Sequence, residues 1–417
     1  MEKVFASIIT IGDELLIGQV IDTNSAWMAQ ELNKIGIILK HRIAVGDVWN
    51  DIWQALDEES KHVSLILITG GLGPTADDIT KPLLCEYFGG RMVIHQPTLD
   101  HVTHIFEKLN RPMIDRNAKQ AEVPDNCTVL KNERGTAPGM LFKKDGKIFI
   151  SLPGVPHEMK WLMSNQVIPM IPEFFKTGFI EHRTLLTAGI GESFLAEMIK
   201  DVEEALPPQI KLAYLPNSGM VRLRLTAFGF DKDELQKEID IHFQLLKQTV
   251  KEFLVTDEDI PMELVVGNLL KQKGKSMATA ESCTGGYIAH LMTSHAGSSA
   301  YFTGSIVSYD NKIKKMLLHV TEETIQSVGV VSETVVKQMA TSVLDIMQTD
   351  YSIAVSGIMG PGGATAEKPV GMVWIAVANK EKTVAKLFNF RYTRQRNIEL
   401  TATNALNLLR IFIMENS

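Results

Sequence analysis

Cysteine, positive charge and long apolar runs are all scarce in this sequence. Only Cys85, Cys127 and Cys283 occur in 417 residues, and no pair has metal-ligand spacing. Such scattered cysteines argue against a disulfide framework or a zinc site and favour a reducing, cytoplasmic setting. No apolar run reaches the roughly 18 residues that a membrane span requires, so we expect no membrane partner. The formal net charge of −7 argues against a general nucleic-acid binder, and we expect no stable nucleic-acid partner.

The composition that is present is that of a folded globular protein. Hydrophobic residues make up 45% of the chain and charged residues 22%. A chain of 417 residues is too long for one ordinary core, so we predict three domains, at residues 1–174, 175–257 and 258–417. Apolar, strand-like runs alternate with helix-patterned segments, which predicts the α/β fold class.

The first domain shows this alternation with short connections. Apolar runs lie at residues 5–11, 37–39 and 65–68, and helical patterns lie at 26–32, 52–61 and 81–88. The alternation predicts a parallel sheet covered by helices, in which ligands bind where the strands reach their carboxyl ends. Two loops fall at that edge, at residues 12–16 and 69–80.

The loop at residues 69–80 combines glycine, threonine and aspartate at one strand end. Its three glycines allow backbone amides to approach a phosphate closely. Asp77 and Asp78 would repel a bare phosphate unless a divalent cation lay between them. The pattern therefore predicts a metal-assisted phosphate or pyrophosphate site. The alternative is a Gly-Pro turn before an acidic helix N-terminus, where the helix dipole favours aspartate.

Long motifs of the first domain resemble those of the competence/damage-inducible CinA family. They lie at residues 9–19, 22–25, 70–75, 135–139 and 152–159. The resemblance covers essentially the whole chain. It implies a first domain similar to molybdopterin-binding domains, which binds ADP-ribose and hydrolyses it to AMP and ribose 5-phosphate with a divalent metal cation.

The resemblance also implies roles for individual residues of this domain. Asp78 falls where molybdopterin-domain relatives have a functional aspartate, so Asp78 and Asp77 are the expected metal ligands. Asn117 and Gln120 match a family segment that is expected near the ligand. The expected nucleotide ligands are Gly12, Asp13, Glu14, Asn24, Thr69, Gly70, Gly71, Gly73, Pro74, Thr75, Asn117 and Gln120.

The middle segment reads as a small α+β module. Strands are expected at residues 183–188, 211–215 and 221–227, and helices at 192–205 and 231–253. The module resembles the KH-like insert of the family, but RNA-binding KH modules need a G-x-x-G loop, and residues 189–192 have the wrong spacing and an acid. Arg222 and Arg224 alternate with apolar residues and are predicted to be a solvated strand face. We expect a spacer or dimerisation element, and hence a homodimer.

The third domain contains a strand, a small-residue turn and a helix start at residues 276–292, with Ser282 in the turn. The first amides of a helix have no intrahelical partner, so the turn could stabilise an anion or an oxyanion. The alternative is that Ser282 or Thr284 caps the helix and that the two following glycines permit the turn. Cys283 could itself be a nucleophile, although a small buried filler is the commoner role.

Two further strand ends carry polar groups. Tyr309 and Lys314 follow a strand at residues 301–308, and Ser356 opens a Gly-rich loop. Since no histidine and carboxylate accompany Ser282 at triad spacing, a lysine with a pKa lowered by burial is the candidate base. Lys314 fits this role, Lys312 competes with it, and the alternative is a solvated lysine.

The third domain is similar to the family's C-terminal domain, known as nicotinamide mononucleotide deamidase. The similar segments are residues 280–286, 309–314, 356–363 and 368–371. The resemblance implies conversion of nicotinamide mononucleotide to nicotinate mononucleotide and ammonia without a cofactor. It implies Ser282 as nucleophile, Lys314 as base and Tyr309 as a nearby helper. The implied substrate ligands are Thr284, Gly285, Gly286, Ser356, Gly357, Gly360 and Arg394.

One position departs from the family pattern. The family often has a second arginine four residues after the first, whereas Arg394 is followed by Ile398 here. The loss of this charge bears on substrate affinity and not on the Ser/Lys chemistry.

Two functional hypotheses follow from the sequence. The first is a two-headed hydrolase of pyridine nucleotide salvage that acts on nicotinamide mononucleotide and on ADP-ribose. The second is a nucleotide- or pterin-binding regulatory protein of competence or DNA-damage responses, with a degraded deamidase domain. The presence of Ser282, Tyr309 and Lys314 favours the enzyme.

Overall fold

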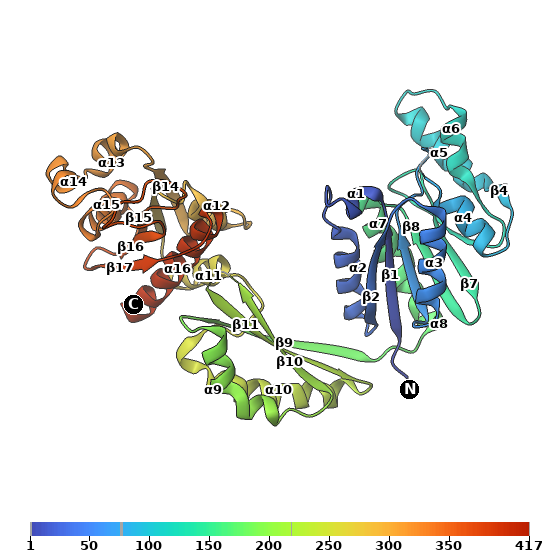
Figure 1. Cartoon of the computed structure of the whole chain (residues 1–417), viewed down its shortest axis with the longest axis horizontal. Coiled ribbons are helices and arrows are strands. Elements are labelled where there is room, and N and C mark those ends of the chain that lie inside the picture. Colours follow the sequence, from blue (N-terminus) through green and yellow to red (C-terminus); the bar gives the residue numbers. More distant parts are fainter. Residues whose placement is uncertain (1, 76–77, 218, 417) are drawn as a thin grey trace. The chain divides into compact units, whose positions relative to one another are not determined.

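The computed structural model describes residues 2–75, 78–217 and 219–416 and forms two compact units. Unit 1 comprises Met1–Glu181 and Ala227–Glu238, and unit 2 comprises His182–Thr226 and Ile239–Ser417. The elements of both units are labelled in Figure 1. The middle module predicted at residues 175–257 therefore contributes residues to both units.

Unit 1 is built on a six-stranded sheet in the order β2-β1-β3-β8-β7-β6. The strands are β1 (Phe5–Ile11), β2 (Ile38–Val45), β3 (Leu65–Thr69), β6 (Thr128–Leu130), β7 (Gly139–Lys144) and β8 (Lys147–Leu152). The first four in this order are parallel, whereas β7 pairs antiparallel with both β8 and β6. The predicted α/β class and parallel arrangement are confirmed, and the antiparallel edge is an addition that the sequence did not predict.

Helices cover both faces of this sheet (Figure 1). They are α1 (Asp13–Leu16), α2 (Thr23–Lys34), α3 (Trp49–Ser60), α4 (Thr80–Tyr87), α5 (Gln96–Lys108), α6 (Asp115–Ala118), α7 (Pro156–Leu162) and α8 (Ile168–Phe174), with short turns η1 (Lys119–Ala121) and η2 (Met163–Val167). Ile8 packs with α2 and α7 on one face, and the adjacent Ile9 packs with α3 and α4 on the other. Since successive strand residues face opposite sides, a strand buried on both faces is mostly apolar, and the buried Ser7 and Thr10 of β1 form hydrogen bonds. A separate ribbon joins β4 (Met92–Ile94) to β5 (Glu122–Pro124).

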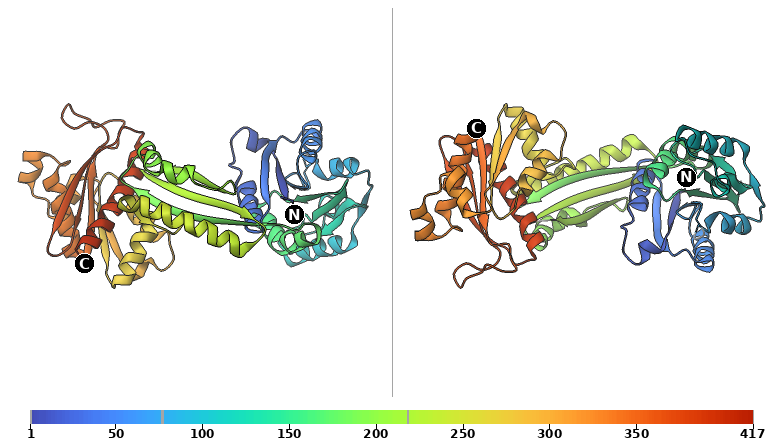
Figure 2. Two further views of the ribbon diagram at one scale, coloured as in Figure 1. Left: turned by 90° about the horizontal axis from the view of Figure 1, so that it is seen from below. Right: turned by 90° about the horizontal axis from the view of Figure 1, so that it is seen from above.

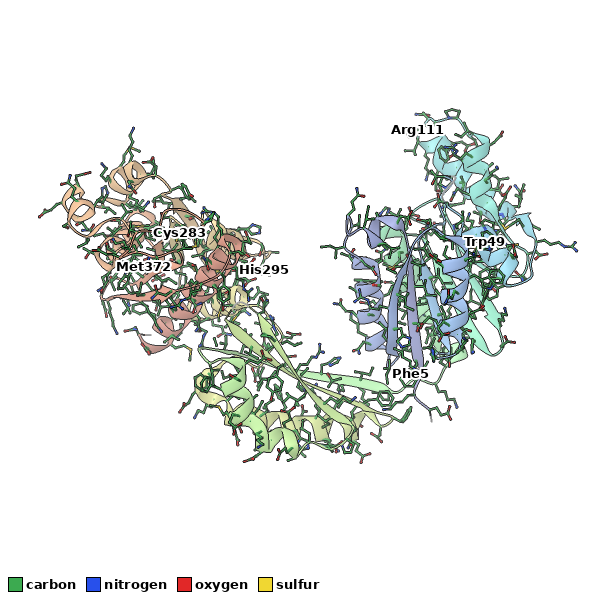
Figure 3. All side chains as sticks on the ribbon, in the orientation of Figure 1. Phe5, Trp49, Arg111, Cys283, His295 and Met372 are labelled. Atoms are coloured by element: carbon green, nitrogen blue, oxygen red, sulfur yellow. The ribbon has the colours of Figure 1, made fainter. Side chains whose placement is uncertain are left out.

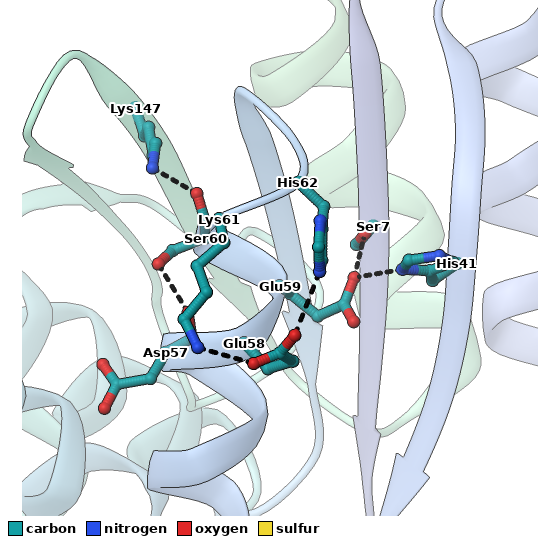
Figure 4. Close-up of polar contacts among 9 residues, drawn as sticks. All are labelled: Ser7, His41, Asp57, Glu58, Glu59, Ser60, Lys61, His62 and Lys147. Atoms are coloured by element: carbon teal, nitrogen blue, oxygen red, sulfur yellow. Dashed lines mark hydrogen bonds and ion pairs between the residues drawn. The ribbon is translucent and has the colours of Figure 1, made fainter.

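A buried carboxylate links three elements of unit 1 (Figure 4). Glu59, in the last turn of α3, is 2% exposed. Its Oε2 accepts a hydrogen bond from the Ser7 hydroxyl of β1 and lies 2.8 Å from Nδ1 of His41 in β2. The neighbouring Glu58 is exposed and pairs with Lys61 and His62. The Glu59 carboxylate therefore joins β1, β2 and α3 from inside the unit.

The middle module has a four-stranded sheet in the order β10-β11-β9-β12. Its elements are β9 (Phe179–Ala188), α9 (Glu192–Glu204), β10 (Ile210–Asn217), β11 (Met220–Gly229), α10 (Lys232–Thr249), η3 (Lys251–Phe253) and β12 (Leu254–Thr256). The two helices lie along one side of the long strands (Figure 2). Leu223 and Leu225 are buried as the alternation predicts. Arg222 is half-buried and lies 3.3 Å from Asp259, so this face is less solvated than predicted.

The rest of unit 2 is built on a five-stranded sheet in the order β14-β13-β15-β16-β17. The strands are β13 (Met277–Glu281), β14 (Phe302–Val307), β15 (Tyr351–Gly357), β16 (Met372–Ala378) and β17 (Thr383–Asn389). The strand β13 is parallel to its two neighbours, β14 and β15, and β16 and β17 continue the sheet antiparallel. The segments that follow β14, β13 and β15 therefore leave from the same edge.

Helices cover both faces of the second large sheet as well. They are α11 (Met262–Lys273), α12 (Tyr287–Thr293), α13 (Asn311–Leu318), α14 (Glu322–Val328), α15 (Glu333–Met347) and α16 (Arg394–Glu415), with a short turn η4 (Ser298–Ala300). The helices α11, α12 and α16 pack on one apolar cluster and α15 on another. The short helices α13 and α14 were not predicted. Within the described residues, none of the helices has the length and apolar character needed to cross a bilayer.

We expect Glu59→Ala to lower the free energy of unfolding of unit 1 by about 1–3 kcal/mol, because it leaves buried polar groups without their acceptor. The matched control is Glu58→Ala, which removes an exposed carboxylate from the same helix turn and should cost much less. Urea denaturation followed by tryptophan fluorescence measures both, since Trp27, Trp49, Trp53 and Trp161 lie in unit 1. Equal losses in the two variants would contradict the structural role of Glu59.

Candidate functional site

A cavity of about 270 Å³ opens at the edge where β13, β14 and β15 end. Seven of the residues predicted for the third domain line this cavity, namely Ser282, Lys314, Tyr309, Ser356, Gly357, Gly360 and Arg394. The turn residues Thr284, Gly285 and Gly286 are not among its lining residues. Asn311, which also lines it, was not predicted, although it lies between Tyr309 and Lys314 in the motif that the sequence analysis used.

Lys314 is a buried lysine with uncharged partners. It is 2% exposed, and its Nζ donates to the carbonyl oxygens of Ser308 at 2.7 Å and Tyr309 at 3.4 Å. Among the described residues, the ammonium donates to these carbonyls and not to Ser282. Burial lowers the pKa of Lys314 below the ordinary value for lysine. The same helix leaves Lys312 exposed, so the two candidate bases have opposite surroundings.

The inward direction of Lys314 comes from α13. Asp310 caps this helix, and its Oδ1 accepts from the Lys312 amide at 2.7 Å. Lys314 and Leu318 are the buried residues of the helix, and their spacing of four places them on one face. Because the sequence analysis did not predict a helix here, it could not derive this orientation from the pattern of residues.

The turn that carries Ser282 is held against the neighbouring strand. The Ser282 amide donates to the Val355 carbonyl of β15 at 3.2 Å, and the Gly285 amide donates back to the Ser282 carbonyl at 3.2 Å. Gly285 and Gly286 have φ values of 63° and 97°, a region that favours glycine. Ser282 is 9% exposed and reaches the cavity.

Cys283, labelled in Figure 3, lines the same cavity as Ser282 and also belongs to the apolar core. Its side chain is 6% exposed and packs in the hydrophobic core of unit 2. Burial raises the pKa of Cys283 to about 12, so the thiol stays protonated near neutral pH. These surroundings match the buried filler that the sequence analysis considered the commoner role.

The helix start after this turn is already occupied by a side chain of the chain itself. The Ile288 and Ala289 amides of α12 donate to the Glu281 carboxylate at 3.0 and 2.8 Å. The Thr284 hydroxyl donates to the same carboxylate at 2.7 Å. These amides lack an intrahelical partner, as expected, but the Glu281 carboxylate already accepts from them. Neither Ser282 nor Thr284 caps the helix, because Glu281 supplies the acceptor.

Arg394, the first residue of α16, connects two sides of the cavity mouth. Its Nη1 donates to the Gly360 carbonyl and its Nη2 to the Tyr309 hydroxyl, both at 2.9 Å. Among the described residues, no carboxylate forms an ion pair with Arg394, so its charge is available to an anionic group. Ile398, where the family often has a second arginine, packs against the hydrophobic core.

The Gly-rich loop after β15 is anchored by Ser356. This serine is 1% exposed, and its hydroxyl donates to the Val330 carbonyl at 2.8 Å. The bond ties the carboxyl end of β15 to the segment between α14 and α15. Ser356 therefore lines the cavity while it holds the loop in place.

A smaller cavity of about 150 Å³ lies in unit 1. Of the predicted nucleotide ligands, Glu14, Asn24, Thr69 and Gly70 line it. The predicted residues Gly12, Asp13, Gly71, Gly73, Pro74, Thr75, Asn117 and Gln120 are not among its lining residues. The lining residues that were not predicted include Thr10, Asp22, Thr23, Gly154 and Pro156. These residues lie within the family motifs at 9–19, 22–25 and 152–159, and those motifs could have been used to predict them.

The polar groups of this cavity join the ends of two strands. The Asn24 Nδ2 donates to the Gly154 carbonyl at 2.7 Å, and the Thr69 hydroxyl donates to the Pro153 carbonyl at 2.9 Å. Asn24 Oδ1 is buried and has no hydrogen-bond partner. A Cβ at Gly70, where φ is 114°, would lie 2.2 Å from the Ile11 carbonyl oxygen, so the close approach requires glycine.

Asp78 closes the Gly-rich loop of unit 1 upon itself. Its Oδ1 accepts from the Gly73 amide at 2.8 Å, and its Oδ2 accepts from the Thr75 amide at 2.8 Å and from the Thr75 hydroxyl. Asp77 lies outside the described residues. Within the described part of the chain, no three His, Cys, Asp or Glu side chains gather as a metal site. Asp78 is therefore engaged by the donors of its own loop.

The segment with Asn117 and Gln120 meets the start of α4. The buried Lys81 donates from Nζ to the Gln120 carbonyl at 2.8 Å. Burial lowers the pKa of Lys81 to about 8. Gln120 is itself 2% exposed, and its Oε1 has no partner. The contact holds this segment against the helix that follows the Gly-rich loop.

Comparison with known proteins identifies all three parts of the chain. Residues 7–173 match the family model of the probable molybdopterin binding domain, and residues 182–255 match that of the damage-inducible protein CinA KH domain. Residues 259–413 match the model of the CinA C-terminal domain.

Full-length relatives agree with these matches. A CinA-like protein of Cytophaga hutchinsonii is 46% identical over 407 residues, covering 98% of this chain and 97% of that protein. One of Flavobacterium psychrophilum is 46% identical over 413 residues, covering 99% of both chains. One of Chloroherpeton thalassium is 43% identical, covering 97% of this chain and 98% of that protein. The chain therefore belongs to the CinA family, with its molybdopterin-binding-like, KH and C-terminal domains in that order.

Proposed function

We propose that the C-terminal domain hydrolyses the carboxamide of nicotinamide mononucleotide to give nicotinate mononucleotide and ammonia. The observation that carries this proposal is the single cavity lined by Ser282, Lys314 and Arg394. It combines a hydroxyl nucleophile, a buried amine and a cation available to a phosphate. These groups can serve as the nucleophile, the base and the phosphate contact in amide hydrolysis of a nucleotide.

The proposed reaction begins with attack of the Ser282 Oγ on the carboxamide carbon. The neutral Lys314 amine takes the hydroxyl proton as the carbon–oxygen bond forms. The resulting ammonium then protonates the departing nitrogen, and the carbon–nitrogen bond breaks to release ammonia. Water hydrolyses the acyl-enzyme by the same exchange of a proton with Lys314 and restores the Ser282 hydroxyl.

The surroundings of the two lysines support Lys314 as the base. Burial disfavours the charged form of Lys314, whereas Lys312 is exposed to water. Burial keeps the Cys283 thiol protonated near neutral pH, and the family resemblance assigns the nucleophile to Ser282. Arg394 would receive the ribose phosphate, and its bond to Tyr309 would bring the phenol toward the substrate.

We expect the full-length protein to release ammonia from nicotinamide mononucleotide, Lys314→Ala to abolish the release, and Lys312→Ala to leave it near the wild-type rate. Because the base acts when neutral, kcat/KM should rise with pH through the pKa of Lys314. Burial lowers that pKa, so the rise should occur below the ordinary lysine value of about 10.4. A coupled ammonia assay across a pH series measures both effects.

The control for these variants is thermal unfolding, which shows whether each remains folded. Loss of activity in Lys312→Ala with retention in Lys314→Ala would assign the base to Lys312. A folded wild-type protein that binds the nucleotide but releases no ammonia would support the alternative function, a regulatory nucleotide-binding protein with a degraded deamidase domain.

For the first domain, we propose binding of ADP-ribose and hydrolysis of its pyrophosphate with a divalent cation. The unpartnered Oδ1 of Asn24, in the cavity that contains Thr69 and Gly70, supports the nucleotide site because it needs a hydrogen-bond donor. A ribose hydroxyl or an amino group of a base would supply that donor. The described carboxylates do not form a cation site, so the metal requirement rests on the resemblance to the family.

We expect release of AMP from ADP-ribose that stops when EDTA removes divalent cations and returns when magnesium is added. Asn24→Leu should weaken binding of ADP-ribose, because the variant removes the acceptor at the cavity wall while keeping a similar volume. Chromatographic detection of AMP and calorimetric titration provide the two measurements. Hydrolysis that is unaffected by EDTA would contradict the metal requirement.

We also propose that the protein is a homodimer. The middle module exposes large apolar side chains on its helices, including Phe194, Met198 and Ile241. Contact with a second copy would remove these side chains from water. Light scattering of the full chain should give twice the mass of 46.3 kDa, and a monomer at micromolar concentration would contradict the proposal.

A further inference from the structure

Glu281 is a wholly buried carboxylate at the end of β13, directly before Ser282, and the sequence analysis assigned no role to it. Its exposed fraction is 0%, and its strand lies between β14 and β15 in the sheet. Burying an ionised carboxylate is costly unless hydrogen-bond donors replace the water that it loses. The position of this carboxylate therefore requires a set of dedicated donors.

Four donors surround the carboxylate. Oε2 accepts from the Thr284 hydroxyl at 2.7 Å and from the Ile288 amide at 3.0 Å. Oε1 accepts from the Ala289 amide at 2.8 Å and from the Thr279 hydroxyl at 3.2 Å. All four are uncharged donors, and because the two amides can only donate, both carboxylate oxygens act as acceptors here.

These bonds connect the residues that precede Ser282 in the sequence with the residues that follow it. Thr279 and Glu281 precede the serine, whereas Thr284 and the first turn of α12 follow it. The carboxylate thus closes the turn across its base and sets the direction in which Ser282 leaves β13. In a serine that must attack a bound amide, displacement of the hydroxyl by about 1 Å can cost a large factor in rate.

The backbone of Glu281 also reaches the proposed base. Its carbonyl oxygen accepts from the Ser308 amide at 2.7 Å, and the Ser308 carbonyl in turn accepts from Lys314 Nζ at 2.7 Å. The same residue therefore contacts the Ser282 turn through its side chain and the strand end that holds Lys314 through its backbone. A substitution at position 281 changes the side-chain contacts with the turn and keeps the backbone carbonyl that accepts from Ser308.

We propose that Glu281 is a positioning residue, whose carboxylate holds the Ser282 turn in the geometry that the proposed amide hydrolysis needs. The inference rests on the proposed function for its effect on rate. Its effect on the conformation of the turn does not depend on the proposed function, because the turn can be probed through the reactivity of Cys283, which is 6% exposed.

The test is Glu281→Gln in the full-length protein, which keeps the shape but presents an amide group to donors. We expect kcat for nicotinamide mononucleotide to fall by about 100-fold while KM changes little, since Arg394 and the Gly-rich loop are untouched. Cys283 should react faster with iodoacetamide, as measured by peptide mass mapping, and Cys127 should react at an unchanged rate. Glu281→Asp should restore part of kcat, because it returns the charge.

Two further variants complete the test. Thr284→Val removes one of the four donors at similar volume, and we expect smaller changes in the same directions. Glu59→Gln alters an equally buried carboxylate of unit 1 and should change neither kcat nor the alkylation of Cys283.

The outcomes separate this proposal from the proposed function. Wild-type kcat and a wild-type alkylation rate in Glu281→Gln would overturn the positioning role, as would a fall in kcat that Glu59→Gln reproduces. If the wild-type protein released no ammonia, the deamidase proposal would fail, and faster alkylation of Cys283 would still support the hold on the turn. If Glu281→Gln did not fold, Thr284→Val would decide the matter in the same two assays.

Discussion

The C-terminal cavity depends on one constraint, the parallel pairing of β13 with strands on both sides. Parallel strands reach their carboxyl ends at the same edge of a sheet, so the segments that leave them must begin side by side. The turn with Ser282 leaves β13, the helix with Lys314 follows β14, and the loop with Ser356 follows β15. Ser282 and Ser356 therefore line one cavity, although 74 positions separate them in the sequence.

Burial then distinguishes residues of the same kind around that cavity. Lys314 and Lys312 belong to one short helix, yet only Lys314 faces the interior, where desolvation favours the neutral amine. Desolvation of Cys283 acts on a group that is charged when deprotonated, and therefore keeps the thiol protonated. Desolvation thus favours the neutral amine of Lys314, which can act as a base, and disfavours the thiolate of Cys283.

Several acidic side chains serve as internal acceptors for the chain's own donors. Glu59 joins three elements of unit 1, Asp78 closes its Gly-rich loop, and Glu281 caps the helix after the Ser282 turn. In each case the carboxylate accepts hydrogen bonds from backbone amides or side-chain groups that would otherwise bond to water. An acidic residue beside a glycine-rich turn is therefore compatible with a structural role as well as with a metal site.

The sequence by itself determined the alternation of the main strands and helices, because apolar periodicity and buried runs follow from which faces lose contact with water, but it missed α13, α14 and the antiparallel edge of the first sheet. It also identified the polar residues that follow β13, β14 and β15, since their motifs are local. Only the tertiary structure decided that Glu281 accepts the α12 amides, that Asp78 faces its own loop and that Lys314 points inward. The direction of a side chain depends on which face of its helix it occupies and on the donors that the fold brings near it. Neither can be derived from the residues adjacent to it in the sequence.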